Sequence, residues 1–176
     1  MKYGVVGTGV MGRNHARILS ELKKIDTLAI FDINPKAARS VAGPIGAEVA
    51  PSLEGLLSDC DAVSICVPTP FHQETGLKAV EHGIHFLMEK PLCQTSSEAR
   101  LLMERVPDDL VAGVGHIERF NPIVDEVRKI IMDPLYVEVH RHNPASSRIV
   151  TGTVVEDLMI HDIDIVMHAL FDREPE

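Results

Sequence analysis

Short apolar runs alternate with amphipathic stretches along the first part of the chain. The runs are rich in valine, isoleucine and leucine, as buried strands are, and between them apolar residues recur at helical spacing. The pattern predicts strands at 3–6, 28–31, 62–67, 85–88 and 111–114, and helices at 10–23, 35–42, 52–58, 72–82 and 96–105. Three of these helices begin after a capping residue, at Asn34, Ser52 and Thr95. Such alternation is typical of an α/β fold with helices covering a parallel sheet.

The pattern changes after Asn121. A helix is predicted at 122–132, then a strand at 135–142 whose apolar and polar residues alternate, and then a last helix at 155–170. An isolated strand leaves its backbone groups unpaired, and one strand with one helix cannot build a second core. We therefore expect the rest of this second unit to be missing or to be supplied by a partner.

Composition narrows the class of partner. The chain has 176 residues, of which 45% are hydrophobic, enough to fill a core. It carries 17 Lys and Arg against 26 Asp and Glu, a formal net charge of −9. Because an acidic surface repels nucleic-acid phosphates and anionic lipids, we expect neither nucleic acid nor a membrane as a partner. An anionic ligand must be captured locally.

The cysteine and histidine spacings give no sign of a metal site. Cys60, Cys66 and Cys93 are an odd number without a CxxC pair, which argues against a disulfide framework and a zinc site. The nine histidines show neither HxxxH nor HExxH spacing, so we expect no metal. No apolar run is long enough for a membrane helix, and the amino terminus makes a poor signal peptide, so we expect a cytoplasmic protein.

A glycine motif joins the first expected strand to the first expected helix. Gly7, Gly9 and Gly12 form G-x-G-x-x-G, and Val10 and Met11 lie within it. The first glycine allows a tight turn, the second admits a pyrophosphate, and the third lets helix and strand pack closely. The free N–H groups of the helix start favour an anion. The motif predicts a dinucleotide-binding loop in a doubly wound Rossmann domain; the alternative is a merely structural glycine turn.

An acidic residue, Asp32, ends the second expected strand about 20 residues after the motif, as in dinucleotide-binding folds. We expect its carboxylate to accept hydrogen bonds from the adenosine ribose and to repel a 2′-phosphate, which favours NAD as the cofactor over NADP. Lys36 could partly offset that repulsion, so NADP stays open.

Three further segments carry a resemblance to a known family. They are Val67-Pro68-Thr69-Pro70-Phe71-His72, Glu89-Lys90-Pro91 and Asp157-x-x-x-His161. With the glycine motif, in this order and spacing, they resemble the glucose-fructose oxidoreductase / inositol dehydrogenase / MocA family over nearly the whole chain. The stretch 114–122 is similar to the subgroup that acts on nucleotide sugars such as UDP-N-acetylglucosamine. In that stretch Arg119 could pair with a substrate phosphate or form an interdomain salt bridge.

The resemblance implies an NAD(P)-dependent dehydrogenase that transfers a hydride between a sugar or nucleotide-sugar hydroxyl and nicotinamide. Lys90 would lie beside the nicotinamide and hydrogen-bond the substrate hydroxyl that becomes a carbonyl. His161 would take the hydroxyl proton, a task that suits histidine, and Asp157 would orient the substrate or the imidazole. Four residues apart on a helix, Asp157 and His161 project from one face; the alternative is a solvent-facing pair.

Other residues would hold the cofactor, again by resemblance. Val67, Pro68, Glu89 and Lys90 would lie around its nicotinamide half. His72 has two open interpretations: it lies against the nicotinamide, or it caps the helix that it begins. His15, just past the glycine loop, is interpreted as a structural helix residue.

Family members are usually much longer and close their substrate pocket with a second α/β domain. The resemblance implies an NAD-binding Rossmann domain at 1–117 and, at 118–176, the truncated start of a substrate domain, with one strand and helices but without its open sheet. An NAD-binding module without turnover is therefore the alternative to a working dehydrogenase. A Rossmann reductase of amino-acid metabolism is a weaker one. A homo-oligomer stays open, because relatives associate through the sheet that is absent here.

Overall fold

The structure is a computed structural model that describes residues 1–132, 134–142 and 153–170. The chain divides into two compact units, Met1–Gly115 and His116–Glu176. Each unit is described by itself.

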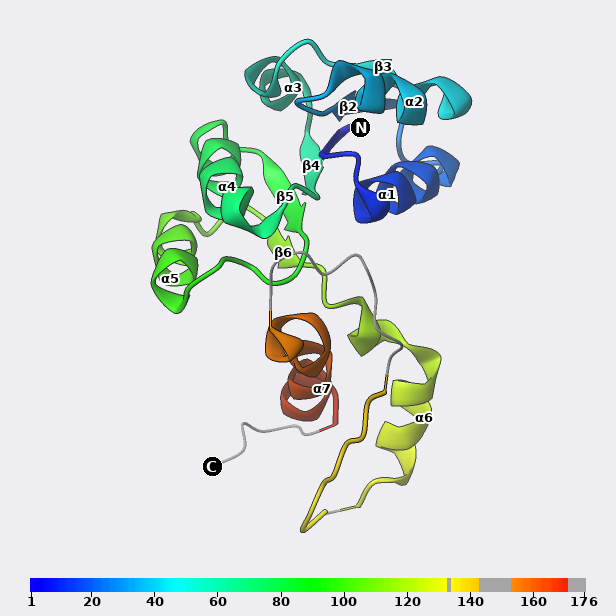
Figure 1. The fold of residues 1–176 in the computed structure, drawn as a ribbon, viewed down its shortest axis with the longest axis vertical. Helices are drawn as coiled ribbons and strands as arrows, with labels where there is room; N and C mark the ends of the chain where they lie inside the picture. The colour runs from blue at the N-terminus through cyan, green and yellow to red at the C-terminus, as the bar shows by residue number, and fades with distance from the viewer. Residues whose placement is uncertain (133, 143–152, 171–176) are drawn as a thin grey trace. The chain divides into compact units, whose positions relative to one another are not determined.

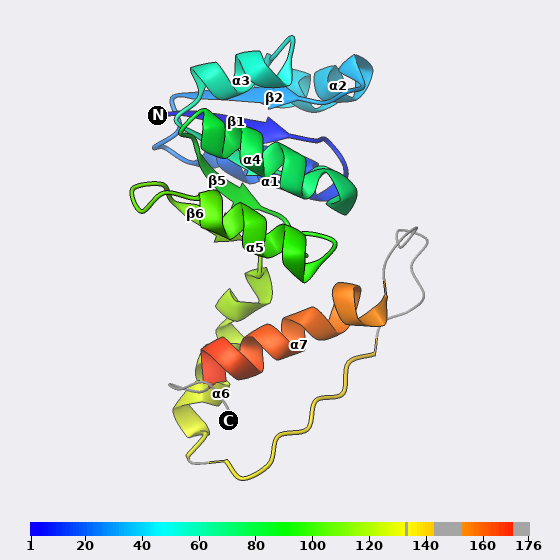
Figure 2. The same cartoon turned by 90° about the vertical axis from the view of Figure 1, so that its left-hand side faces the viewer.

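A six-stranded parallel sheet forms the middle of the first unit (Figures 1 and 2). Its order is β3-β2-β1-β4-β5-β6. The strands are β1 (Lys2–Val6), β2 (Thr27–Phe31), β3 (Glu48–Val49), β4 (Ala62–Ile65), β5 (His85–Met88) and β6 (Ala112–Val114). The strand order reverses between β1 and β4, the kind of switch point at which α/β proteins bind ligands beyond the carboxyl ends of the strands. The predicted doubly wound Rossmann fold is confirmed.

Helices cover both faces of this sheet. They are α1 (Val10–Glu21), α2 (Pro35–Ile45), α3 (Leu53–Asp59), α4 (His72–Glu81) and α5 (Ser96–Arg105), with a short 3-10 turn, η1 (Thr69–Phe71), before α4. Figure 2 shows α3, α4 and α5 along one face. Their apolar side chains share a core with Val6, Ile65 and Met88, whereas α1 and α2 share a second core with Val5 and Ile30. Alternating residues of β1 thus face opposite cores.

Side-chain caps begin three of the helices, as the sequence predicts. The Asn34 side chain accepts hydrogen bonds from the backbone N–H groups of Lys36 and Ala37, and that of Ser52 accepts one from Gly55. Thr95 and Glu98 form a reciprocal capping box. These local bonds explain why α2, α3 and α5 begin where they do.

The main differences from the sequence prediction in the first unit are one additional strand and the ends of two elements, while other ends differ by one or two residues. The edge strand β3 was not predicted, because its two residues are both exposed and show no apolar alternation. Helix α2 runs to Ile45 rather than to residue 42. It tolerates Pro44 because the proline lies in the last turn, where the helix is about to end. Strand β4 ends at Ile65, and Cys66 leaves the ladder after donating to the Val6 carbonyl (2.8 Å).

The second unit consists of helical segments and an extended stretch. It begins with η2 (Ile117–Phe120) and α6 (Pro122–Ile130). The later helix is a π-segment, η3 (Val155–Met159), then α7 (Ile160–Asp164), then a second π-segment, η4 (Ile165–Leu170). It covers the predicted span and packs on α6 and η2.

The strand predicted at 135–142 is wrong in this structure. Residues 134–142 form neither helix nor strand, although Figure 2 shows them as a drawn-out trace, and no described segment pairs with them. An alternating pattern specifies one wet and one dry face, yet a strand also needs a neighbour for its backbone groups. Leu135 and Tyr136 are accordingly 98% and 78% exposed.

Candidate cofactor and catalytic sites

The three motif glycines have distinct structural reasons. Gly7 adopts a φ of +91°, and a Cβ there would lie 2.7 Å from the Cys66 carbonyl oxygen. A Cβ on Gly12 would lie 1.9 Å from the Gly7 carbonyl oxygen, so the fold requires glycine at both positions. A Cβ on Gly9 would meet no atom within 4 Å. The space above Gly9 is therefore one that the fold leaves open.

The start of α1 is suited to an anion. Gly9 is its N-cap, no side chain caps it, and its first turn contains no acidic residue. Val10 is exposed and Met11 is half-buried in that turn. Uncapped N–H groups and the positive end of the helix dipole attract phosphate, and the open space above Gly9 would admit it. The loop therefore fits a pyrophosphate.

Asp32 lies at the end of β2, fixed against the glycine loop. Its Oδ2 accepts from the Thr8 backbone N–H (2.7 Å) and hydroxyl (2.6 Å), and its Oδ1 accepts from the Asn34 N–H (2.8 Å). Burial alone would raise the pKa of Asp32, but the bonds from the Thr8 hydroxyl, the Asn34 backbone and the Thr8 backbone outweigh it and lower the pKa. A carboxylate has about four acceptor positions, so about one is left for a ribose hydroxyl.

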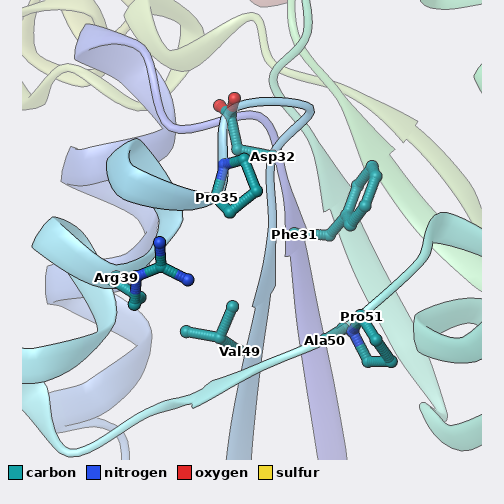
Figure 3. A pocket seen from close by; sticks show the side chains of 7 residues that line it. All are labelled: Phe31, Asp32, Pro35, Arg39, Val49, Ala50 and Pro51. Atoms are coloured by element: carbon teal, nitrogen blue, oxygen red, sulfur yellow. The ribbon is translucent and has the colours of Figure 1, made fainter.

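A pocket of about 430 Å³ opens beside Asp32. It is lined by Phe31, Asp32, Pro35, Arg39, Val49, Ala50 and Pro51. Figure 3 shows the Arg39 guanidinium reaching from α2 over Val49, with the Asp32 carboxylate at the far end of the same pocket. Apolar walls, one cation and one carboxylate suit a nucleoside.

The loop after β4 is tied to the turn after β5 by a buried histidine. His72 is 1% exposed. Its Nδ1 lies 2.8 Å from the Pro91 carbonyl oxygen and its Nε2 lies 2.9 Å from that of Val67. A neutral imidazole carries one N–H, so the ring donates to one of these two carbonyls, and it does not cap the helix. Pro68, by contrast, is exposed.

The Glu89-Lys90-Pro91 segment follows β5, and its Lys90–Pro91 peptide is cis. Glu89 is 7% exposed, and its Oε1 lies 2.9 Å from His15 Nε2. His15 Nδ1 lies 3.0 Å from the Ser64 hydroxyl, which lies 3.3 Å from the Tyr3 hydroxyl. Lys90 itself is half-buried. The structure thus gives His15 a specific partner in the turn that carries Lys90.

Asp157 and His161 lie on the long helix of the second unit, in η3 and α7, and both are half-buried. The structure brings these two together on one helix. Lys90 belongs to the first unit, so the three residues proposed to act on the substrate are divided between the units.

Two arginine–aspartate pairs hold the helix just after His161. Arg119 binds both carboxylate oxygens of Asp164, its Nε at 3.1 Å from Oδ2. Burial would raise the pKa of Asp164, but the Arg119 hydrogen bond and nearby cationic groups outweigh it and lower the pKa. Arg141 binds Asp162 through Nε (2.8 Å) and a terminal nitrogen (2.7 Å). Arg119 therefore pairs within its own unit, which corrects the interdomain salt bridge, while its pairing with a substrate phosphate stays a prediction.

Comparison with known proteins settles the family. The model of an oxidoreductase family with an NAD-binding Rossmann fold, the glucose-fructose oxidoreductase / inositol dehydrogenase / MocA family, matches residues 1–116. The chain belongs to this family. A UDP-N-acetylglucosamine 3-dehydrogenase of Acidithiobacillus ferrooxidans is 35% identical over 169 residues, 95% of this chain and 53% of that protein. An inositol 2-dehydrogenase/D-chiro-inositol 3-dehydrogenase of Halalkalibacterium halodurans is 31% identical over 189 residues, 100% of this chain and 54% of that protein.

Solved structures of the family agree. The Acidithiobacillus ferrooxidans enzyme superposes with a TM-score of 0.88 at 34% identity, covering 96% of this chain and 56% of that one. A myo-inositol dehydrogenase of Lactobacillus casei, solved with NAD(H) and myo-inositol, has a TM-score of 0.80 at 28% identity, covering 97% and 54%. The chain spans about half the length of the curated relatives it matches.

The three cysteines are free thiols. Burial raises the pKa of Cys60 to about 11 and that of Cys66 to about 12, so both are poor nucleophiles. Within residues 1–132, 134–142 and 153–170, no three His, Cys, Asp or Glu residues gather where they could hold a metal ion. None of the described helices is long and apolar enough to cross a membrane.

The sequence prediction missed two residues of the cofactor region and the partner of a third, His15. Thr8, buried inside the glycine motif, bonds to Asp32. Arg39 lines the pocket one helical turn after Pro35, at an i+4 spacing that could have been read from α2. His15 carries no local signal, because its partner Glu89 is 74 residues away in the chain.

Proposed function

We propose that this member of the family is an NAD-dependent dehydrogenase of a sugar or nucleotide-sugar hydroxyl. One observation carries the proposal. The glycine loop, the Val67–His72 segment and the Glu89–Lys90 segment follow β1, β4 and β5, which are neighbours in a parallel sheet. Their residues therefore emerge at one edge of the sheet, where a dinucleotide lies in such folds.

The residues around this edge fit each part of the cofactor. The pyrophosphate would lie over Gly9 and the first turn of α1, and the ribose would bond to Asp32. The adenine would enter the pocket beside Arg39, whose planar guanidinium can stack on an aromatic ring. Val67, Pro68 and Lys90 would border the nicotinamide. The bound cofactor supplies the hydride acceptor.

NAD fits better than NADP. A 2′-phosphate would meet the Asp32 carboxylate, which the lowered pKa keeps charged. Lys36 and Arg39 are the cations within reach of that region on α2, and both are exposed. Exposed cations offset a fixed adjacent carboxylate only weakly, because solvent screens them.

The chemistry needs a donor and a base. Lys90 would donate a hydrogen bond to the substrate oxygen and favour its conversion to a carbonyl oxygen as hydride leaves the carbon. His161 would accept the hydroxyl proton, and Asp157 would orient the imidazole. The Arg119–Asp164 and Arg141–Asp162 pairs would keep His161 on a fixed helix. The relatives' names indicate a cyclic polyol or a nucleotide sugar as the substrate class.

The test is NADH formation with a panel of sugars, inositols and UDP-sugars. Turnover with one class is expected, together with a loss of at least about a hundredfold in Lys90→Ala and His161→Ala. Calorimetric titration with NAD separates the alternative. A chain that binds NAD but turns over no member of the panel would be an NAD-binding module without turnover.

A further inference from the structure

Lys90 is flanked by two residues that each lie within hydrogen-bond distance of a histidine, His72 fully buried and His15 mostly so. On the amino-terminal side, Glu89 is bound by His15 of α1 at 2.9 Å. On the carboxyl-terminal side, the Pro91 carbonyl oxygen lies 2.8 Å from Nδ1 of His72 of α4. The two histidines come from helices on opposite faces of the sheet. They reach the same three-residue turn from two directions.

The donors and acceptors of the two His15 hydrogen bonds can be assigned. An ionised carboxylate only accepts, so His15 Nε2 donates to Glu89 and its Nδ1 is left to accept from the Ser64 hydroxyl. The Tyr3 hydroxyl can then donate to Ser64 at 3.3 Å. The side chains of His15 and Glu89 are 12% and 9% exposed. A hydrogen bond in such a site is difficult to replace with water.

The same residues resemble a Ser–His–carboxylate group of a hydrolase, but the burial excludes that activity. Ser64 is 1% exposed in the middle of β4, so no substrate can reach its hydroxyl. These residues instead form a structural chain of hydrogen bonds from Ser64 of the sheet through His15 to Glu89.

The room around Glu89 is also tight. A Cβ on Gly115 would lie 3.2 Å from Glu89 Oε1. The carboxylate is therefore confined by His15 and by the backbone after β6. The His72 ring is enclosed as well, at 1% exposure, and either ring nitrogen that carries a hydrogen finds a carbonyl.

We propose that His15 and His72 are positioning residues that hold the Glu89–Pro91 turn from both sides and so set where Lys90 is presented to the substrate. The importance of that placement rests on the proposed function of Lys90. His72 thus acts through the turn and contacts neither cofactor nor substrate. His15 also ties this turn to α1, which fixes the distance between the pyrophosphate loop and Lys90.

Paired amide substitutions test this proposal. The amide nitrogen of Asn lies near the place of a histidine Nδ1, and that of Gln near the place of Nε2. His15→Gln keeps a donor toward Glu89, whereas His15→Asn keeps only the Ser64 side. At position 72 the order reverses, because His72→Asn keeps the donor toward Pro91 and His72→Gln keeps the one toward Val67.

The proposal predicts a crossed result. His15→Asn and His72→Gln should lower kcat about tenfold or more, with KM for NAD within about twofold, while His15→Gln and His72→Asn stay close to the unmodified chain. The NMR signal of Lys90 in protein with isotope-labelled lysine should shift in His15→Asn and His72→Gln and stay unchanged in His15→Gln and His72→Asn. Gly115→Ala should shift it too, because the new methyl group displaces Glu89. The exposed His82→Gln is the control and should change neither readout.

A merely structural role would give a different pattern. In that case the two variants at one position would differ in unfolding midpoint as well as in kcat. We expect instead that the two variants at each position unfold at the same midpoint, so that a difference in kcat or in the Lys90 signal does not come from stability. If the two variants at one position shift Lys90 equally, or in the reverse order, the proposal is wrong. If the unmodified chain has no turnover, the proposed function fails, yet the Lys90 signal still decides the positioning claim.

Discussion

The two units of this chain are ordered by different kinds of contact. In the first, two apolar cores lie on either side of the sheet, and partly buried hydrogen bonds tie the loops at its carboxyl edge. In the second, Val124 and Asp164 are the buried residues among those described, and arginine–aspartate pairs hold the helix. Both apolar cores thus belong to the first unit, which is why its sheet edge is the better defined part of the proposed site.

The largest predicted effect is in the first unit, where a substitution in the glycine loop should lower both stability and NAD binding. Gly12→Ala places a Cβ 1.9 Å from the Gly7 carbonyl oxygen, so α1 must shift away from β1. We expect a loss of about 3 kcal/mol or more in the free energy of unfolding, measured by urea titration, with NAD binding abolished.

Gly43→Ala is the matched control for this substitution. A Cβ there meets no atom within 4 Å, and the position is inside α2. We expect a stability equal to that of the unmodified chain or up to about 1 kcal/mol higher, since alanine favours a helix. Equal losses at both glycines would contradict the steric account.

A smaller effect is expected in the second unit. Arg119→Ala leaves the Asp164 carboxylate, 6% exposed, without its bidentate partner. We expect a loss of about 1–3 kcal/mol, below that of a fully buried pair because Arg119 is 38% exposed. Hydrogen exchange should rise in 160–164 and stay unchanged in β1 and β4. Lys129→Ala, which removes an exposed pair with Glu126, should cost less than about 0.5 kcal/mol. Faster exchange in the first unit would mean that the two units are not independent.

The smallest predicted effect is the change in the free energy of unfolding at acid pH, which should separate the two units. The pKa values of Asp32 and Asp164 are both lowered in the folded chain. Their stabilisation is therefore present above the unfolded value, about 4, and is lost as the pH falls through the lower folded value. Each carboxylate should contribute at most about 1 kcal/mol, because both sites are partly screened. Urea titrations from neutral to acid pH should show a shallower acid limb in Asp32→Asn for the first unit and in Asp164→Asn for the second.

Local periodicity explains why so much of the first unit is predictable. The strands, the helices, the capping residues and the glycine loop with Asp32 follow from spacings of a few residues. The His15–Glu89 and His72–Pro91 contacts do not, because they join segments 74 and 19 residues apart without any repeat between them.

The predicted strand at 135–142 shows the converse limit. Alternation specifies which face of a strand is wet but not whether a neighbour exists to pair with it. Likewise, Arg119 could be recognised as a charged residue near the end of the Rossmann domain. Its partner Asp164, on a helix 45 residues later, is set by the fold of the second unit.

The most direct test of the central claim, that the first unit is a complete NAD site, is a calorimetric titration of the chain and of Gly9→Ala with NAD. A Cβ at Gly9 meets no protein atom but would fill the space assigned to the pyrophosphate. The account predicts one-site binding to the unmodified chain, weakened about tenfold or more in Gly9→Ala, with the free energy of unfolding unchanged within about 0.5 kcal/mol. Equal NAD affinity in the two proteins, or a folded chain that binds no NAD, would contradict it.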